Sequence, residues 1–511
     1  MSASKHYDVA VLGMGLGALT SAALLARRGW RVVVVGHGHR RATYALDDVS
    51  FSRRPFTFLG ASSPTWGRVL VELAQSQTFR RRLTPVDPMF QLCMPGVRVE
   101  LPPDTVLFQR EIDREFPASR RVLDDLYGEL AKTNAVADEV FEHDAVWPPG
   151  GFWERRETEK LSAALPWAGD PDLLAELPLD HAFRAAVDLS VRFAADQVDP
   201  LPTFSRARLH GAWTRGVQAL EGGEEELTDF LVERLRAHGG ELLASDRVER
   251  LAIKGGKVRG VYLSGEEEPI GVTFVVLDGA MEDVVEIAPD VARKLEEQET
   301  RVEPVEGRFV VSLVVRTDGV PASLGAESFV VPSEGLPMRL QRARVGDGVE
   351  RLTAEALLPL GSPLDRQRSR MCTSLFEVLP FVERHVVACD SPHDGLPVWD
   401  ARDPGPSAVE VTPGLRARRR DRTAVRPSGG SLDAEPMIPR YAVRAPTLRG
   451  LGGEPLRAGI GNVFLAGRGA LPSLGQEGQL LAAWGVARII TRTDRRKEKM
   501  LRDMWSKVEL S

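Results

Sequence analysis

The stretch that most constrains the fold lies near the N-terminus, at Asp8–Gly36, and reads DVAVLGMGLGALTSAALLARRGWRVVVVG. Short apolar runs at its two ends predict buried parallel strands. The segment Ala18–Arg28 between them has neither Gly nor Pro and predicts a helix, which a glycine-rich turn joins to the first strand. Strand, glycine turn, helix and strand in this order predict the βαβ unit of a dinucleotide-binding, Rossmann-type domain.

The small residues of the turn predict how a nucleotide would be held. Gly13 permits the tight turn, Gly15 lets the backbone approach a pyrophosphate, and Gly17 follows two residues later. Ala18 stands at the position where a small residue lets the helix pack closely on the strand. The free N–H groups and the positive dipole end of the helix would face the phosphates.

The end of the second strand departs from this pattern. An Asp or Glu is expected there to hold a ribose hydroxyl, but the chain has Gly36. His37, Gly38, His39, Arg40 and Arg41 come next, and we expect the two histidines to face solvent. A missing acid with nearby arginines suits the 2′-phosphate of NADP, and it equally suits a flavin site that has degenerated. The residues leave both interpretations open.

Length and composition narrow the class of protein. A chain of 511 residues is too long for one core and predicts two or three domains. A net charge of −6 gives no reason to expect a nucleic-acid partner. The three cysteines form no CxxC pair and the nine histidines are scattered, so we expect no structural disulfide and no metal site. We also expect no signal peptide and no membrane span, hence a cytoplasmic protein.

The order of elements predicts an α/β protein, α+β overall, with a discontinuous FAD- or NAD(P)-binding Rossmann-type domain. We place that domain at residues 1–85, 211–300 and 446–493. An inserted substrate or cap domain, a mixed sheet plus helices, takes residues 86–210 and 301–445. Residues 494–511 form an amphipathic basic helix that either docks on the protein's own surface or lies on an anionic membrane.

Two further segments have definite expectations. Met89–Leu101 predicts a β-hairpin that turns at Pro95 and Gly96. The basic stretch Leu415–Pro427 is expected to be a solvated loop, with a patch for an anionic ligand or a membrane surface as the alternative.

Three separated blocks resemble one family. They are GMGLGA, GGEEELTDFLVERLRAHGGELLASDRVERL and GNVFLAGRGALPSLGQEGQLLAAWG. In this order and spacing they resemble the flavin amine-oxidase superfamily, and most closely its phytoene desaturase (carotenoid dehydrogenase) branch. The segment FQLCMPGVRVELPPD is similar to the substrate-side hairpin of the desaturases.

The resemblance implies an FAD spread along the two-part nucleotide domain. Its pyrophosphate would lie at Gly13, Gly15 and Gly17, and its adenine would meet the backbone near Val248. Its ribityl chain and isoalloxazine would meet the C-terminal block, at Gly467, Arg468, Gly475 and Gly478. The implied reaction removes hydride from a C–C bond of an apolar, isoprenoid- or lipid-like small molecule, and the flavin carries that chemistry. No catalytic residue is assigned and no oligomeric state is predicted.

Two carboxylates of the family pattern are missing. Gly36 replaces the acid that binds the adenosine ribose, and Arg468 replaces the acid that follows Leu-Ala-Gly near the C-terminus. Three hypotheses remain: a flavin-dependent oxidoreductase with a rewired site, a degenerate relative that serves as a binding or scaffold protein, and an NADP-binding enzyme that uses Arg40 or Arg41. Whether the pocket between Gly15 and Arg468 is open or filled by side chains discriminates the second hypothesis, and tighter binding of NADPH than of NADH would support the third.

Overall fold

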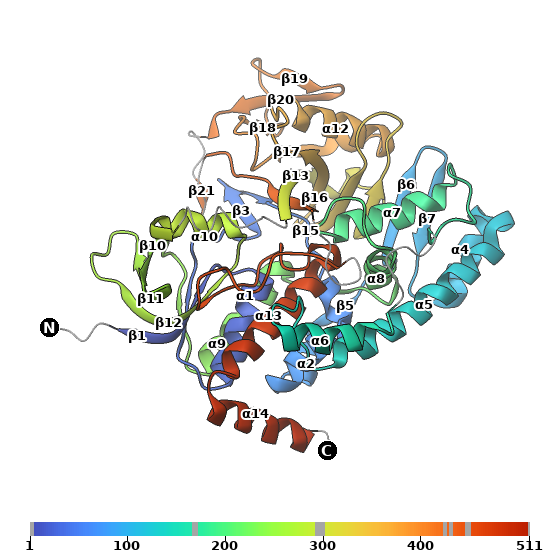
Figure 1. Ribbon diagram of the computed structural model, residues 1–511. Coiled ribbons are helices and arrows are strands. Elements are labelled where there is room, and N and C mark those ends of the chain that lie inside the picture. Colours follow the sequence, from blue (N-terminus) through green and yellow to red (C-terminus); the bar gives the residue numbers. More distant parts are fainter. Residues whose placement is uncertain are drawn as a thin grey trace.

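The computed structural model describes residues 5–165, 172–291, 302–422, 427–428, 433–444 and 451–508. Two large sheets dominate this part of the chain (Figure 1). The first lies at the lower left of the view with helices α1, α9 and α13 beside it, and the second lies at the top. Helices α4, α5, α7 and α8 extend to the right, and α6 lies below the centre of the view.

The first sheet is assembled from three separate parts of the sequence. Its strands, in spatial order, are β10 (Val248–Lys254), β11 (Lys257–Leu263), β12 (Ile270–Leu277), β1 (His6–Leu12), β2 (Val32–Val35) and β9 (Glu241–Leu243), with β23 (Val463–Leu465) paired to β12. The pairs β1–β2, β1–β12, β2–β9 and β12–β23 are parallel, whereas β10, β11 and β12 pair antiparallel. The predicted α/β fold with a discontinuous Rossmann-type domain is confirmed. The exact domain boundaries stay predictions.

Helices bury this sheet, which explains its apolar strands. Helix α1 (Leu16–Arg27) packs against α9 (Gly223–Ala237) and α13 (Gly475–Thr491). All four residues of β2 are buried valines, as expected for a parallel strand that is covered on both faces. Because β1 and β12 pair in parallel, their carboxyl ends lie side by side. The turn at Gly13 follows the carboxyl end of β1.

The second sheet is mixed and carries the long strands of the inserted region. Its spatial order is β19 (Val409–Thr412), β20 (Leu415–Arg420), β18 (Val398–Asp400), β17 (Val386–Asp390), β13 (Val302–Arg316), β16 (Val349–Pro359), β15 (Met338–Gly346), β14 (Glu327–Val330), β6 (Phe90–Met94) and β7 (Val97–Leu101), with β22 (Ile438–Val443) beside β13. The hairpin prediction is confirmed, since Met94 faces Val97 across the turn. The expectation of a loop after Leu415 is wrong for β20, which pairs with both β18 and β19. Residues 423–426 of that stretch lie outside the described residues.

Smaller elements complete the description. Two small sheets contain β21 (Pro427–Ser428), β3 (Thr43–Leu46) and β4 (Val49–Ser52), and β5 (Leu83–Pro85) with β8 (Gln218–Leu220). The remaining α-helices are α2 (Pro64–Glu72), α3 (Ser76–Arg80), α4 (Thr105–Glu115), α5 (Arg120–Glu142), α6 (Phe152–Ser162), α7 (Ala182–Ala194), α8 (Thr203–Thr214), α10 (Met281–Ile287), α12 (Gln367–Val378) and α14 (Arg495–Val508). Short 3-10 turns occupy Leu59–Ser62, Pro117–Ser119, Pro289–Val291, Thr317–Gly319, Val382–His385 and Pro472–Leu474.

The C-terminal helix α14 docks on the body of the protein. Trp505 packs against Trp484 of α13 with their rings 6.2 Å apart, and the Arg68 guanidinium lies over both rings. Lys497 donates to the Gly29 carbonyl at the end of α1. Within the described residues, no helix has the length and apolar composition that crossing a bilayer requires.

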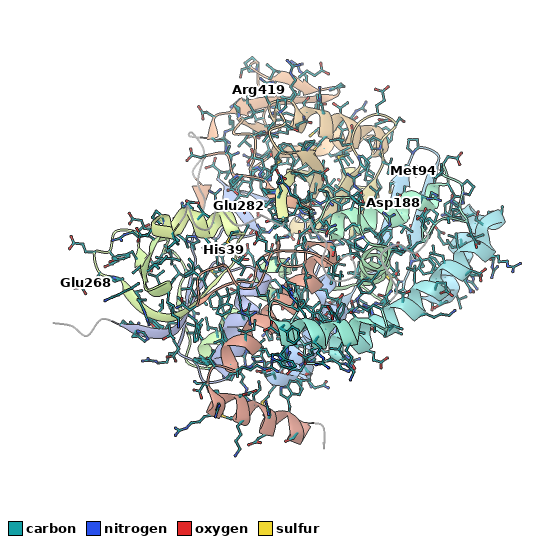
Figure 2. The ribbon with its side chains drawn as sticks, in the orientation of Figure 1. His39, Met94, Asp188, Glu268, Glu282 and Arg419 are labelled. Atoms are coloured by element: carbon teal, nitrogen blue, oxygen red, sulfur yellow. The ribbon has the colours of Figure 1, made fainter. Side chains whose placement is uncertain are left out.

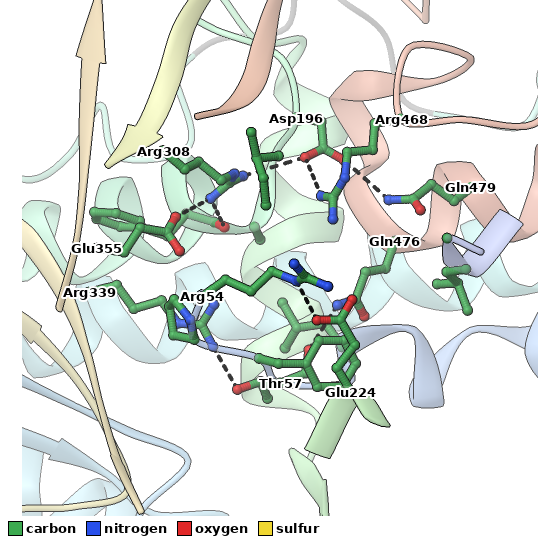
Figure 3. A pocket seen from close by; sticks show the side chains of 18 of the residues that line it. Arg54, Thr57, Asp196, Glu224, Arg308, Arg339, Glu355, Arg468, Gln476 and Gln479 are labelled. Atoms are coloured by element: carbon green, nitrogen blue, oxygen red, sulfur yellow. Dashed lines mark hydrogen bonds and ion pairs between the residues drawn. The ribbon is translucent and has the colours of Figure 1, made fainter. Parts of the chain in front are cut away.

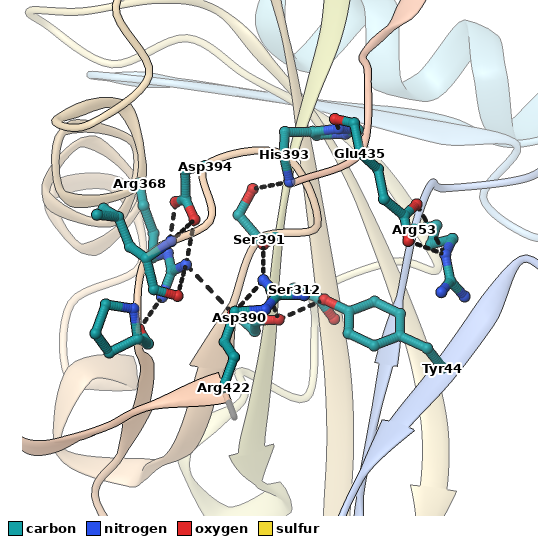
Figure 4. A network of polar contacts seen from close by, with 12 residues as sticks. Tyr44, Arg53, Ser312, Arg368, Asp390, Ser391, His393, Asp394, Arg422 and Glu435 are labelled. Atoms are coloured by element: carbon teal, nitrogen blue, oxygen red, sulfur yellow. Dashed lines mark hydrogen bonds and ion pairs between the residues drawn. The ribbon is translucent and has the colours of Figure 1, made fainter. Parts of the chain in front are cut away.

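A buried polar network fastens the strands β3 and β4 to the second sheet (Figure 4). The Tyr44 hydroxyl donates to Asp390 at 2.8 Å, and the Arg53 Nε atom donates to both carboxylate oxygens of Glu435 at 2.9 Å. At the centre, the fully buried Arg368 bonds Asp390 at 3.2 Å and Asp394 at 2.8 Å. Each buried carboxylate thus has a cation beside it, which offsets the free-energy cost of removing it from water.

Replacing Arg368 with leucine is expected to lower the free energy of unfolding by about 3–5 kcal/mol, because buried Asp394 loses its cation and Asp390 is left with Arg422 at 3.3 Å. Urea denaturation measures this. Arg366→Leu is the matched control, because its side chain is 80% exposed and lies 3.7 Å from its neighbour Asp365. Equal stability of the two variants would contradict a structural role for the network.

Candidate functional site

A cavity of about 250 Å³ lies where the two large sheets meet (Figure 3). The start of α1 and the loop after β4 contribute to its wall, and the end of α7, the start of α9 and the loop before α13 complete it. Strands β13, β15 and β16 of the second sheet close the opposite side. Of the residues predicted to bind a cofactor, Gly15 and Arg468 line this cavity.

The N–H group of Gly15 is already bonded by the protein itself. The Asp278 carboxylate, which follows β12, accepts from it at 2.5 Å. A methyl group added to Gly13 or Gly15 would lie 2.5 or 2.4 Å from the Asp278 side chain, so this side chain occupies the concave face of the glycine turn. Burial raises the pKa of Asp278, while the bond from Gly15 and the charge of Arg468 lower it.

The other predicted glycines are explained by contacts within the chain. A Cβ on Gly17 would lie 2.0 Å from the Ala466 carbonyl oxygen, and Ala18 is fully buried against the sheet. Gly467 packs on the backbone of Gly279. Gly475 and Gly478 are tight against the carbonyl oxygens of Ala194 and Leu471, both 2.2 Å from an added Cβ. They lie within the first turn of α13, which begins at Gly475.

The absent ribose-binding acid has a steric reason. A Cβ on Gly36 would lie 1.9 Å from the carbonyl oxygen of Ala244, which follows β9. Any side chain at this position would force the turn away from the sheet. Glycine is therefore required by packing at the point where the family pattern places an acid.

A side chain of the protein also occupies the predicted adenine contact at Val248. The Val248 N–H donates to Nδ1 of His37 at 3.1 Å, so an imidazole of the chain occupies that donor. His37 is half-buried, and burial lowers its pKa and favours the neutral ring that can accept this bond. His39 is half-buried as well and lines the cavity, near the centre of the molecule in Figure 2. The expectation that both histidines face solvent is therefore corrected.

The side chains of Arg40 and Arg41 pair with carboxylates outside the cavity wall. Arg40 forms an ion pair with Glu435 at 2.9 Å, and Arg41 approaches Glu225 at 3.8 Å with 69% of its side chain exposed. Neither contributes to the cavity wall. A 2′-phosphate at Arg40 would have to compete with Glu435.

Arg468 belongs to an ion-pair network centred on the buried Asp196, at the end of α7. Asp196 accepts from Arg468 at 3.1 Å and lies 3.5 Å from Arg308, which also bonds Glu355 (Figure 3). Burial alone would lower the pKa of Arg468, but Asp196, Glu224 and Asp278 outweigh it and raise that pKa. The guanidinium is thus held charged by the protein's own acids.

The remaining charged groups around the cavity are paired too. Arg54 bonds Glu224 at the start of α9, and Arg339 bonds Glu327 at 3.1 Å and the Thr57 hydroxyl at 2.7 Å. Glu477, in the first turn of α13, is held bidentately by Arg208 at 2.6 and 2.7 Å. The amide of Gln479 reaches Asp196 at 3.3 Å.

Sequence reasoning missed the acids that fill this site. Asp278 had a usable signal, because it directly follows the apolar run Val272–Leu277, and the carboxyl ends of parallel strands converge at one edge. Asp196 and Arg308 had none, since they come from the inserted region and reach the cavity only through tertiary packing. Arg54, in the loop after β4, likewise meets the cavity only through tertiary packing. No cluster of His, Cys, Asp and Glu suited to a metal ion occurs within the part of the chain that the structure describes.

These contacts decide whether the residues around the cavity could hold an FAD. A dinucleotide needs the Gly15 N–H free for its pyrophosphate and the Val248 N–H free for its adenine, and both are bonded by side chains. The cavity of about 250 Å³ lies below the roughly 300–1,000 Å³ of pockets that enclose a drug-sized ligand. In this arrangement the residues do not fit an FAD, and Asp278 would have to leave the glycine turn to admit one.

Comparisons with known proteins address the fold. No protein-family model and no curated protein sequence matches the chain. An oxidoreductase from Methanosarcina mazei superposes with a TM-score of 0.57 at 15% identity, covering 94% of this chain and 99% of that one. A redesigned variant of putrescine oxidase gives 0.55 at 14% identity over 96% and 100%. Wild-type putrescine oxidase bound to putrescine gives 0.50 at 14% over 96% and 99%. These superpositions show the fold, which is that of FAD-binding oxidoreductases with a Rossmann-type domain.

One buried acid beside the site makes stability depend on pH. Glu454 is 2% exposed, accepts from the Met281 N–H at 3.0 Å and has a second carboxyl oxygen with no hydrogen-bond partner among the described residues. Burial raises its pKa from 4.5 to about 8. Between these values the folded protein keeps a proton that the unfolded chain releases, so its stability falls as the pH rises.

We expect Glu454→Gln to remove a decline of about 1.4 kcal/mol per pH unit between pH 5 and pH 8, since the amide stays neutral and can still accept from Met281. Chemical denaturation at several pH values measures the slope. Glu282→Gln, at an exposed neighbour, is the control. A slope that Glu454→Gln leaves unchanged would contradict the assignment.

Proposed function

We propose that this chain is a redox-inactive relative of the flavin oxidoreductases that share its fold, and that it serves as a binding or scaffold protein. One observation carries the proposal: the Asp278 carboxylate takes the Gly15 N–H, the donor that a cofactor pyrophosphate would need. Fold alone does not decide function, so the occupied donor outweighs the likeness to enzymes.

Electrostatics strengthens this reasoning. Two like unit charges 4 Å apart repel by about 4 kcal/mol at an effective dielectric constant near 20. A pyrophosphate at the glycine turn would meet Asp278 at or below this distance unless the acid moved or took up a proton. Such a penalty weakens binding by about a thousandfold, at ~1.4 kcal/mol per tenfold. Arg468 offsets part of it, although Asp196 already engages this guanidinium.

A flavin-dependent oxidoreductase is the second candidate. The cavity favours it, because it lies beside the N-terminus of α1 and between the two sheets, where a fold of this class would hold its cofactor. The desaturase branch and an apolar isoprenoid substrate have less support, since Arg54, Asp196 and Arg308 line that cavity. An NADP site has still less support, because Arg40 is paired with Glu435.

Peripheral contact with a membrane stays a proposal for α14. Arg495, Arg496, Lys499 and Arg502 are exposed on this helix, while its Trp505 faces the protein. This surface would favour anionic lipid electrostatically, and Met500 on the same helix is 56% exposed.

The test of the proposal is flavin content. The purified protein is expected to be colourless, to release no flavin when denatured, and to take up no FAD on dialysis. Asp278→Ser removes both the charge and the bulk at the glycine turn, so this variant should bind FAD more tightly than the wild type. Equilibrium dialysis measures both proteins.

Glu282→Gln is the matched control, because it removes one nearby exposed negative charge without opening the turn. A yellow wild-type protein whose flavin is released on denaturation would overturn the proposal and favour the oxidoreductase. An Asp278→Ser variant that binds FAD no better than the wild type would show that Asp278 is not what closes the site.

A further inference from the structure

An exposed aromatic pair stands at the start of helix α6. The side chains of Phe152 and Trp153 are 72% and 73% exposed, and their rings lie edge to face with centroids 5.3 Å apart. Among the described residues, no other two exposed aromatic side chains are neighbours in sequence. Single exposed apolar side chains are ordinary on protein surfaces, whereas a protruding pair of large rings indicates a contact surface.

The acids near this helix start are engaged by the protein itself. Glu154 accepts from the N–H groups of the two preceding glycines at 2.9 and 2.8 Å and bonds Arg457 at 2.7 Å. Glu157, three residues later, bonds Arg488 of α13 at 3.0 Å. These contacts fix the first turns of α6 on the body of the protein, and both carboxylates already have a cation beside them.

The exposed side of α6 carries cations. Arg155, Arg156 and Lys160 are exposed, and within the described ranges none of their side chains forms an ion pair or a hydrogen bond. Because residues three and four apart share one side of a helix, Trp153, Arg156 and Lys160 form a single stripe. Glu159 is an exposed acid of the same helix. A chain whose net charge is −6 thus presents three free cations beside its exposed aromatic pair.

We propose that the start of α6 docks on the surface of an anionic lipid bilayer. Phe152 and Trp153 enter the interfacial region, where aromatic rings are favoured. Arg155, Arg156 and Lys160 contact the phosphate and carboxylate groups of the lipid headgroups. Large apolar side chains joined to a cationic stripe are typical of helices that lie at a bilayer surface.

Shape and charge together favour a bilayer over a protein partner. Aromatic anchors of protein interfaces fill well-packed pockets on the partner, so they require a matching shape. A fluid interface accepts two projecting rings without such a pocket, and the free cations beside them complement a negatively charged surface. The inference goes beyond the proposed function and does not rest on it, since flavin binding plays no part in this contact.

The basic helix α14 lies close to α6. Asp144 accepts from the Trp484 ring N–H at 2.8 Å and pairs with Arg488 at 3.1 Å, and these two residues lie one turn apart on α13. Arg488 also bonds Glu157 of α6, while Trp484 packs on Trp505 of α14. The two helices are therefore neighbours along α13, and both lie below the centre of the view in Figure 1. The exposed cations of α14 add positive charge near the docking site.

Sedimentation with lipid vesicles tests the inference on the whole chain. One set of vesicles contains phosphatidylcholine and phosphatidylserine in equal amounts, and the other contains phosphatidylcholine alone. The wild type is expected to bind the anionic vesicles at least about tenfold more strongly than the neutral ones, and added sodium chloride should weaken this binding.

Two double variants separate the apolar from the charged contribution. Phe152→Ser with Trp153→Ser should weaken binding to anionic vesicles at least about tenfold, because it removes both rings. Arg155→Gln with Arg156→Gln should weaken the same binding by about tenfold or more and abolish most of its salt dependence. All four side chains are exposed, so both variants should melt at the temperature of the wild type.

Matched controls come from exposed side chains elsewhere. Leu179→Ser removes a single apolar side chain that is 90% exposed, and Arg121→Gln removes one charge from a side chain that is 95% exposed on α5. Both proteins should bind the anionic vesicles as tightly as the wild type.

Three results would overturn the inference. One is a wild type that binds both kinds of vesicle equally or binds neither. Another is an aromatic double variant that binds as tightly as the wild type while Arg495→Gln with Arg496→Gln loses binding, which would assign the contact to α14 alone. The third is a wild-type dimer in sedimentation velocity that the aromatic double variant converts to a monomer, because a second copy would then cover the rings. Flavin content is read separately by absorbance, so failure here is distinguishable from failure of the proposed function.

Discussion

The hydrogen bond from the Gly15 N–H to the Asp278 carboxylate is the constraint on which the interpretation of this molecule depends. It joins the glycine turn after β1 to the end of β12, the two strands whose carboxyl ends meet at the edge of the first sheet. A helix N-terminus with free donors attracts an anion, and here the chain supplies that anion itself. A charge-assisted bond of this kind contributes about 1.5–3 kcal/mol, which any incoming phosphate must replace.

The same pattern repeats at the other predicted cofactor contacts. A buried backbone donor needs a partner, whether from a ligand or from the chain. The Val248 N–H donates to His37, and the Arg468 guanidinium donates to Asp196. Gly36 cannot regain the lost acid, because the Ala244 carbonyl occupies the space of a side chain. The rearrangement is therefore distributed over separate contacts, and a single substitution does not restore the family pattern at all of them.

The fold was predictable because its signals are local. The glycine turn, the apolar strands and the Pro95–Gly96 hairpin are each specified by neighbouring residues, and the comparisons bear out the Rossmann-type architecture. The site was predictable only where it reuses those local motifs, at Gly15 and Arg468. Acids such as Asp196 reach the cavity from the inserted region, and nothing in their sequence neighbourhood reports which charge they will meet. The strand at Leu415–Arg420 was missed because the alternation of buried Leu415 and Ala417 with arginines is short, while the high arginine content of the stretch favours a solvated loop.

A crystal structure of the protein purified and crystallised with excess FAD tests the central claim most directly. The account predicts electron density for the Asp278 carboxylate on the Gly15 N–H and for His37 on Val248, with no flavin between the two sheets. A pyrophosphate on the Gly15 N–H, with Asp278 rotated out of the glycine turn, would contradict it.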